Sequence, residues 1–261
     1  MTFSQRAVLA AVMVGATAPL VGTFLVRRGM ALVGDGLGHL AFAGVAIAPL
    51  IGVSPLPVAL VVALAGAAVV EIVRWKSAGR SDLAIAFVFY ASIALAVVVL
   101  AAGKRYNSRV LGVLFGSLLT VSNWELVTMA LVLFAATLVT VFFYRPLVMI
   151  SIDDELAQAS GVSPRRYGML ISLSTAAVVV AGMPAVGILL ISALLVLPAA
   201  TAQNAVSGFA RTLGAASLLG ASTAAVGTLG ALRVDVPPGA AIVVLASALY
   251  LSSLGTRRTR N

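Results

Sequence analysis

Long apolar stretches with at most one ionisable residue recur along this chain and leave few folds open to it. A helix needs about 20 mostly apolar residues to cross the hydrocarbon core of a bilayer. Of the 261 residues, 61% are hydrophobic and 10% are charged, whereas a soluble domain has roughly 45–50% and 25%. We therefore predict an all-α, polytopic transmembrane protein. The candidate spans are residues 7–26, 36–52, 57–73, 83–102, 124–144, 167–183, 186–202, 212–232 and 238–254.

The number of spans is eight or nine. The two stretches joined at Met183-Pro184 fit either a tight hairpin or one bent unit. The mixed segment 106–123 is too polar to span, and its core, 110–119, is predicted to be a short outer-side or re-entrant helix. Because the connecting segments are too short to bury a core, residues 1–261 are predicted to form a single transmembrane domain.

Basic residues indicate the orientation. The chain carries 17 Lys and Arg against 8 Asp and Glu, a net charge of +9. Such a charge in a soluble protein would point to nucleic acid, but membrane proteins concentrate Lys and Arg in cytoplasmic loops. We therefore expect no nucleic-acid partner. With an outer N-terminus and nine crossings, the cytoplasmic residues are Arg27, Arg28, Arg74, Lys76, Arg80, Arg145, Arg165, Arg166, Arg211, Arg257, Arg258 and Arg260, and the outer ones are Arg6, Lys104, Arg105, Arg109 and Arg233.

Asp35 and His39 are an ionisable pair that belongs to the second predicted span. Most other acidic residues lie in loops or at the edges of spans, where their charge needs no special explanation. Glu71, by contrast, can pair with Arg74 three residues on. A helix places Asp35 and the chain's only histidine on one face, about 6 Å apart along its axis. Carboxylate and imidazole are ligands for a first-row divalent cation. The alternative is that Asp35 merely pairs with His39 or Arg28.

Three glycines lie next to or between these two residues. The pair by itself supplies only half of the ligands that a metal site needs. Gly34, Gly36 and Gly38 would let an ion or another helix approach closely. Further ligands must come from another helix, a second subunit, water or backbone carbonyls. The absence of cysteine excludes disulfides and thiolate ligands.

The polar segment 151–166 is predicted to contain a short cytoplasmic helix. Asp153, Asp154 and Glu155 suit its N-terminus, Gly161 is a natural stop, and Ile152, Leu156 and Ala159 share one small apolar face. A solvated loop and a docking helix for a partner are both compatible with this pattern. The chain has no phosphate-binding G-x-x-x-x-G-K-[ST] motif, so any ATP-driven transport needs a separate ATPase.

Five segments in order resemble one family, the membrane permeases of zinc, manganese and iron ABC importers, of the bacterial zinc-uptake type. The resemblance covers essentially the whole chain. One departure is that Gly36 and Gly38 replace somewhat larger residues. The segments are Gly34-Asp35-x-x-x-His39, 114–119, Asp154-Glu155-x-Ala157-x-x-x-Gly161, 186–202 and Asp235-Val-Pro-Pro-Gly239.

This resemblance implies a bacterial inner (plasma) membrane protein with the permease fold of the vitamin B12 and siderophore importers. It implies a homodimer that is embedded in membrane lipid. Its protein partners would be two cytoplasmic ATP-binding subunits and an extracytoplasmic metal-binding protein. It assigns the metal to Asp35 and His39, and Asp235 to the metal path or a gate on the outer side, with a helix cap before Pro237 as the alternative. Coupling to the ATPase falls to residues 151–165, through Asp153, Asp154, Glu155, Ala157 and Gly161.

The expected function is therefore non-enzymatic import of a divalent metal ion, with no permanently bound cofactor. Imidazole favours zinc, while manganese or iron stay open. A proton-coupled secondary transporter that uses Asp35 and His39 as a relay is an alternative, as is a permease for a metal chelate. An intramembrane aspartyl protease is disfavoured because it needs two carboxylates.

Overall fold

A computed structural model of the chain describes residues 3–76, 81–103, 123–234 and 236–257. Within these ranges the fold is entirely helical. The helices are α1 (Phe3–Arg27), α2 (Val33–Ile47), the 3₁₀ helix η1 (Ala48–Leu50), α3 (Pro55–Lys76), α4 (Ser81–Gly103), α6 (Asn123–Phe142), α7 (Tyr144–Ile152), α8 (Asp154–Ala159), α9 (Pro164–Val186), α10 (Ile188–Ala205), α11 (Phe209–Val234) and α12 (Pro238–Arg257).

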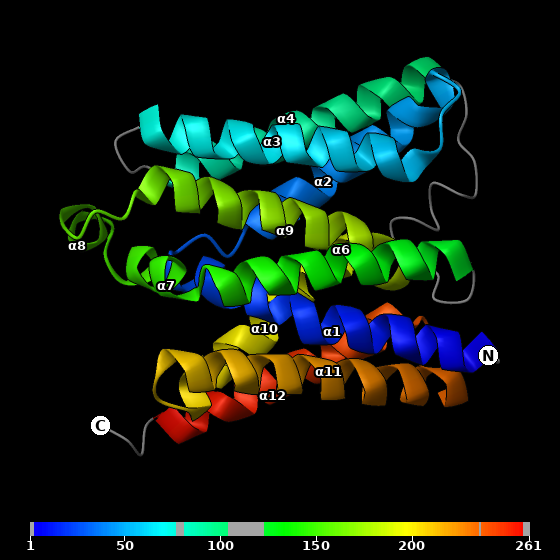
Figure 1. The fold of residues 1–261 in the computed structure, drawn as a ribbon. Coiled ribbons are helices and arrows are strands. Elements are labelled where there is room, and N and C mark those ends of the chain that lie inside the picture. The colour runs from blue at the N-terminus through cyan, green and yellow to red at the C-terminus, as the bar shows by residue number, and fades with distance from the viewer. Residues whose placement is uncertain (1–2, 77–80, 104–122, 235, 258–261) are drawn as a thin grey trace.

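Each predicted span coincides largely with one of these helices, which confirms the all-α, multi-pass fold class. Seven described helices have the length and apolar composition of a membrane span, and α4 and α10 add the shorter apolar stretches Ala86–Val99 and Leu190–Ala205. Figure 1 shows the long helices lying side by side across the molecule. Two predictions, the short helix at 110–119 and the role of Asp235, lie outside the described residues.

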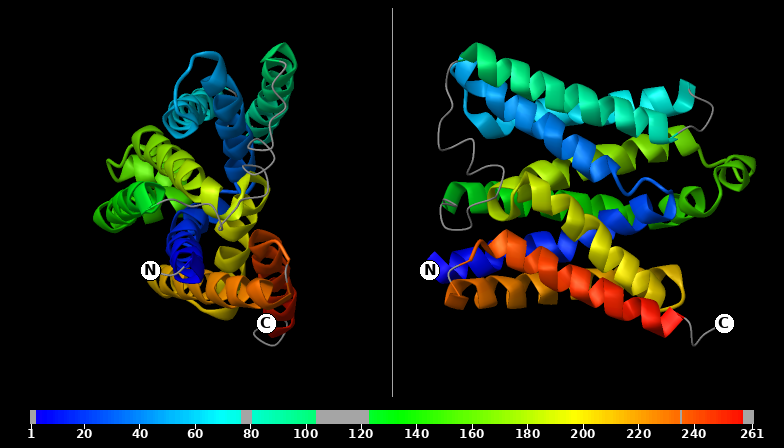
Figure 2. Two further views of the ribbon diagram at one scale, coloured as in Figure 1. Left: turned by 90° about the vertical axis from the view of Figure 1, so that its right-hand side faces the viewer. Right: turned by 180° about the vertical axis from the view of Figure 1, so that it is seen from behind.

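The chain reverses between α9 and α10, so the tight-hairpin alternative is the observed one. Gly187 alone separates the two helices, and its φ of +92° lies in a region that residues with a Cβ rarely adopt. Figure 2 shows α10 running back across the bundle from this turn. The long helices therefore alternate in direction, and the start of α1 and the end of α12 lie at opposite ends of the bundle (Figure 1).

The short helices α7 and α8 project from one end of the bundle, which we call the α8 end (Figure 1). The sequence predicts a short helix within 151–166, which corresponds to α8, and no separate helix between the predicted span 124–144 and that segment. Pro146 is compatible with the first turn of a helix, and Leu147 and Ile150 bury one face of α7. The i, i+3 spacing of these two residues was the available signal for this helix.

Basic residues gather at the α8 end, as the predicted orientation requires. The positive-inside rule therefore continues to predict a cytoplasmic α8 end. Arg6 and Arg233 lie toward the opposite end, near the start of α1 and the end of α11. The described basic residues at the α8 end are Arg27, Arg28, Arg74, Lys76, Arg145, Arg165, Arg166, Arg211 and Arg257.

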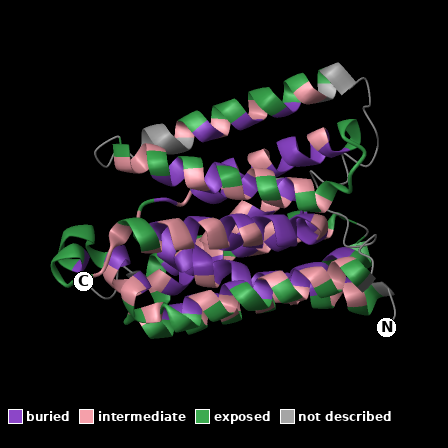
Figure 3. Cartoon of the chain, turned by 45° about the horizontal axis from the view of Figure 1, so that its top comes forward, coloured by how far each residue is buried: buried purple, intermediate pink, exposed green. Residues whose placement is uncertain are grey.

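The core lies along the inner helices. Most of α1, α2 and α9 is buried, whereas α6 and α12 expose most of their apolar surface. Figure 3 shows buried residues in the middle of the bundle and exposed residues along its outer faces. Exposed apolar side chains such as Val61, Leu131 and Val244 are compatible with lipid contact.

Close approach of α1 and α11 depends on glycine at facing positions. A Cβ on Gly15 would lie 2.5 Å from the carbonyl oxygen of Gly220, and a Cβ on Gly220 would collide with the carbonyl oxygen of Gly15. The Ser217 hydroxyl donates a hydrogen bond of 2.8 Å to the Ala16 carbonyl across the same interface. Small residues let helix backbones pack closely in lipid, where apolar burial gives little drive for association.

We predict that Gly220→Ala destabilises the protein while Gly214→Ala on the same helix does not. The added methyl at position 220 meets α1 backbone and should cost about 1–3 kcal/mol. A Cβ at Gly214 meets nothing within 4 Å, so that variant should gain helix propensity, up to about 1 kcal/mol. Thermal unfolding in detergent, followed by size-exclusion fluorescence, measures both; equal melting temperatures would contradict the predicted contact.

Candidate metal site and docking helix

The helix that carries Asp35 and His39 is short and enclosed by its neighbours. α2 packs against α3, α4, α9 and α10. Added Cβ atoms at Gly34 and Gly38 would lie 2.9 Å from Leu195 Cδ1 and 3.0 Å from Ile188 Cγ2, both on α10. The predicted close approach of another helix at these glycines is therefore present, and the neighbour is α10. Gly36 is different, because its Cβ would make an ordinary contact of 3.8 Å with Val88 of α4.

Asp35 and His39 both lie half-buried on α2, between α10 and α4. The Ser192 hydroxyl of α10 donates a long hydrogen bond of 3.4 Å to Asp35 Oδ1. The imidazole of His39 packs edge-on against the Phe89 ring of α4, with centroids 5.0 Å apart. The two candidate ligands therefore share one helix face, as the spacing predicted.

Asp35 does not pair with His39 or Arg28, the two partners that the alternative interpretation offered. Arg28 is directed toward Ile150 and Asp154 at the α8 end. Among the described residues, no hydrogen bond or ion pair joins Asp35 to His39. Both groups consequently keep lone pairs that can bind a cation.

Within the described residues, Asp35 and His39 supply only part of the ligand set of a metal site. No group of three or more His, Cys, Asp or Glu side chains comes together in that part of the molecule, and Asp235 lies outside it. Ser192 adds one oxygen beside Asp35, and sequence reasoning missed it. Its signal was that it is the one polar residue in the run from Ile188 to Leu197.

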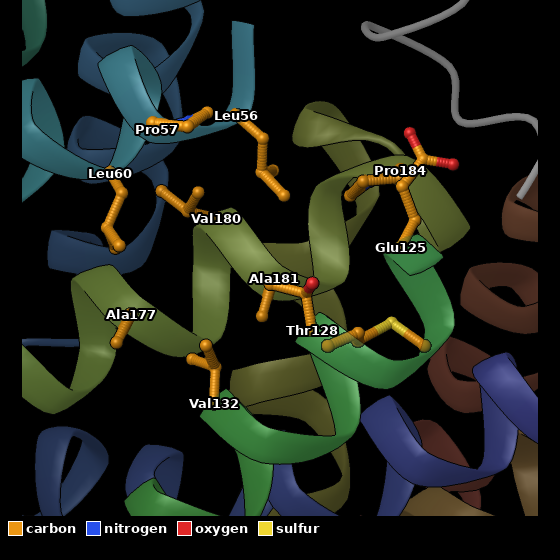
Figure 4. Close-up of a pocket in the computed structure, with 11 residues that line it drawn as sticks. Leu56, Pro57, Leu60, Glu125, Thr128, Val132, Ala177, Val180, Ala181 and Pro184 are labelled. Carbon is orange, nitrogen blue, oxygen red and sulfur yellow. The ribbon is translucent and has the colours of Figure 1, made fainter. Parts of the chain in front are cut away.

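A separate pocket of about 140 Å³ lies between α3, α6 and α9, toward the end opposite α8. Figure 4 shows apolar side chains from these three helices converging on it, with Glu125 and Thr128 of α6 at its edge. Neither Asp35 nor His39 lines this pocket. It is therefore distinct from the candidate metal site.

The predicted short helix at the α8 end is present. The Asp153 carboxylate caps α8 by accepting hydrogen bonds from the backbone N–H groups of Glu155 and Leu156, at 2.8 and 3.0 Å. After α8, Gly161 adopts a φ of +80°, which suits a glycine stop. Ala157 is fully buried against the bundle, whereas Glu155 is exposed.

The outer surface of this segment presents apolar side chains to solvent. Ile152 and Leu156 are 70% and 62% exposed, and Ala159 is exposed beside them. Leucine and isoleucine on a solvated helix at the end of a membrane protein are typical of a contact surface for another protein. The prediction of one helix face is wrong for Ile152, because the extended backbone of Asp153 separates it, as the last residue of α7, from Leu156 and Ala159 of α8. We call Leu156 and Ala159, the exposed apolar residues of α8, the α8 apolar face.

Comparisons with known proteins identify similar membrane proteins. A manganese transport system membrane protein, MntC, of Halalkalibacterium halodurans is 34% identical over 95% of this chain and 85% of that protein. A manganese import system permease protein, ScaB, of Streptococcus gordonii is 30% identical over 96% of this chain and 90% of that protein.

The fold is similar to a solved structure, that of PsaBC from Streptococcus pneumoniae in complex with Fab. The superposition has a TM-score of 0.87 and 30% sequence identity, and covers 99% of this chain and 94% of the other. Residues 1–257 match the profile of the ABC 3 transport family. The chain is therefore a multi-pass membrane protein of the ABC 3 transport family, a family of metal ABC permeases.

Proposed function

We propose that this chain is the translocation subunit of an ABC importer that carries manganese into the cytoplasm of a bacterium. The observation that carries the proposal is the Asp35–His39 pair, held half-buried on a helix within the apolar bundle. Ionisable residues are costly inside a membrane and mark ion paths. The relatives named for manganese support the same activity.

Manganese replaces zinc, the metal that the sequence favoured, as the proposed cargo. That preference rested on the imidazole of His39, and the relatives described above give it no support because their names specify manganese. The Asp35 carboxylate and the Ser192 hydroxyl lie together at 3.4 Å. Oxygen donors suit Mn²⁺, whereas zinc and copper bind nitrogen-rich and sulfur-rich sites strongly.

A small number of metal ligands in each subunit is suited to transport. A translocating ion must bind well enough to enter and weakly enough to leave. One carboxylate, one imidazole and one hydroxyl from each chain would leave coordination positions for water or for a second copy of the chain. The half-exposure of Asp35 and His39 in the single chain is compatible with that arrangement.

The energy source in this proposal is a pair of cytoplasmic ATPase subunits that dock on α8. The α8 apolar face supplies contact area, and Asp153, Glu155, Ala157 and Gly161 shape the helix that presents it. An extracytoplasmic binding protein would deliver the ion at the opposite end. ATP binding then shifts the dimer between two packings, and hydrolysis resets it.

Removal of either ligand should abolish transport without dismantling the protein. We predict that Asp35→Asn and His39→Gln each lower manganese uptake at least about tenfold, because the loss of one ligand from a sparse site removes most of its affinity. Uptake of radioactive Mn²⁺ by cells that express the complete transporter measures this. The matched control is Gly36→Ala on the same helix, whose methyl would make only an ordinary contact.

Normal uptake in either ligand variant would contradict the assigned site. Co-purification of the ATPase with each variant separates lost transport from lost assembly. Uptake that persists when ATP is depleted but fails when the proton gradient is collapsed would instead favour the proton-coupled transporter.

Docking should depend on the apolar character of position 156. We predict that Leu156→Glu weakens ATPase binding by about tenfold or more, as expected for an apolar anchor in an interface. Leu156→Met keeps the apolar contact and should bind normally. Because this side chain is 62% exposed, both variants should keep the parental melting temperature. Equal recovery of ATPase with the two variants would refute α8 docking through this face.

A further inference from the structure

An ion-pair network, buried except at Asp154, joins the docking helix to three parts of the transmembrane bundle. Its first member is Arg28, which directly follows α1 and whose side chain is 3% exposed. Arg28 Nη1 donates to the carbonyl oxygen of Ile150 in α7, and Nη2 donates to Asp154 Oδ2 in α8, both at 3.4 Å. One guanidinium therefore links the α1–α2 connection to both short helices.

The network continues from Asp154 into α3 and α9. Arg74 Nη1 lies 3.7 Å from the same Asp154 oxygen. Arg74 also donates to Glu71 Oε2 from Nε and Nη2, at 3.1 and 2.9 Å, as the i, i+3 spacing predicted. Glu71, only 1% exposed, accepts a hydrogen bond of 2.8 Å from the Ser172 hydroxyl of α9.

The backbone of α9 passes directly against this network. A Cβ on Gly168 would lie 2.9 Å from Arg74 Nη2 and 3.1 Å from Glu71 Oε2. Glycine at this position therefore lets α9 contact the charged groups without displacing them.

Asp154 is the member that reaches the solvent. Its side chain is 45% exposed, against 3% for Arg28 and 11% for Arg74. Burial, followed by repulsion from Arg74, lowers the pKa of Arg28 below its ordinary value, whereas Asp154 and Glu71 act to raise it. Because separating a buried charge from its partner is strongly unfavourable, a displacement of α8 would draw Arg28 with it or leave that charge unpaired.

The segment that Arg28 would move is short and internally hydrogen-bonded. The backbone N–H of Met30 donates to the Leu25 carbonyl at 2.9 Å, and that of Val33 donates to the Met30 carbonyl at 3.1 Å. Met30 itself is 1% exposed. Asp35 follows Arg28 by only seven residues, so this connection links the network firmly to the start of α2.

We propose that Asp154 is a positioning residue that couples the docking helix to the metal site, through Arg28 to α2 and through Arg74 and Glu71 to α3 and α9. The inference rests on the proposed function and adds the physical route by which α8 acts. Packed ionic networks with two discrete arrangements can carry such coupling between distant sites. In this account the ATPase moves α8, and the paired arginines move α2 with it.

The test measures manganese ions imported per ATP hydrolysed. The complex of this chain with its ATPase and binding protein is reconstituted in proteoliposomes, as the parent and as Asp154→Asn, Arg28→Gln and the double variant. We expect each single variant to retain the ATPase and hydrolyse ATP, while the ratio of ions to ATP falls at least about fivefold. The double variant should be no worse than the poorer single variant, because both changes break one link.

The matched control is Lys76→Gln, which removes an exposed positive charge from the end of α3 and should keep the parental ratio. An unchanged ratio in Asp154→Asn, or a double variant whose loss is the product of the two single losses, would overturn the inference. Loss of the ATPase from Asp154→Asn would also overturn it, because the residue would then serve docking alone. Because Arg28 is buried, Asp154→Asn remains decisive if Arg28→Gln does not assemble.

Failure of the proposed function is distinguishable from failure of this coupling. If the parent complex imports no manganese, the proposed function is refuted and the coupling falls with it. If the parent imports manganese and the variants keep its ratio, only the coupling is refuted.

Discussion

Polar groups inside a lipid bilayer have no water to bind, and this constraint shapes most of the chain. Backbone amides are satisfied by helix formation. Buried hydroxyls donate back to the preceding turn, as Thr23 does to the Pro19 carbonyl at 2.7 Å and Thr228 to the Ala224 carbonyl at 2.7 Å. Glu71, which lies near the end of its span, is held by Arg74 and Ser172. These buried polar groups are thus occupied by hydrogen bonds and ion pairs within the bundle.

Asp35 and His39 differ from these groups because they keep unused hydrogen-bonding capacity. The polar contact of Asp35 in the described chain is one long hydrogen bond, and the described contact of the His39 ring is with an aromatic edge. A carboxylate and an imidazole left with spare capacity in such an environment are costly unless they serve an ion. The glycines of the short helix α2 let it pack closely against α10. The helix places both groups on one face, between α10 and α4.

The sequence predicted the spans well and the tertiary partners poorly, for physical reasons. Hydropathy and charge placed the spans, and spacing alone paired Glu71 with Arg74. We did not predict α7, because the predicted span took in Tyr144, and the two buried apolar residues that follow, Leu147 and Ile150, are too few to establish a helical pattern. Ser192 and the link between Arg28 and Asp154 join residues more than 100 positions apart, and nothing local in the sequence encodes such contacts. The resemblance to metal permeases supplied the family, whereas the residues alone supplied only half of a metal site.

ATP-driven accumulation of manganese in sealed vesicles tests the central claim most directly. The chain would be reconstituted with its ATPase and its binding protein, with ATP supplied on the side of the α8 end and Mn²⁺ or Zn²⁺ on the other. The account predicts that Mn²⁺ accumulates in the ATP compartment, that accumulation stops without ATP, and that Mn²⁺ enters faster than Zn²⁺. Accumulation driven by a proton gradient without ATP, or of Zn²⁺ in preference to Mn²⁺, would contradict it.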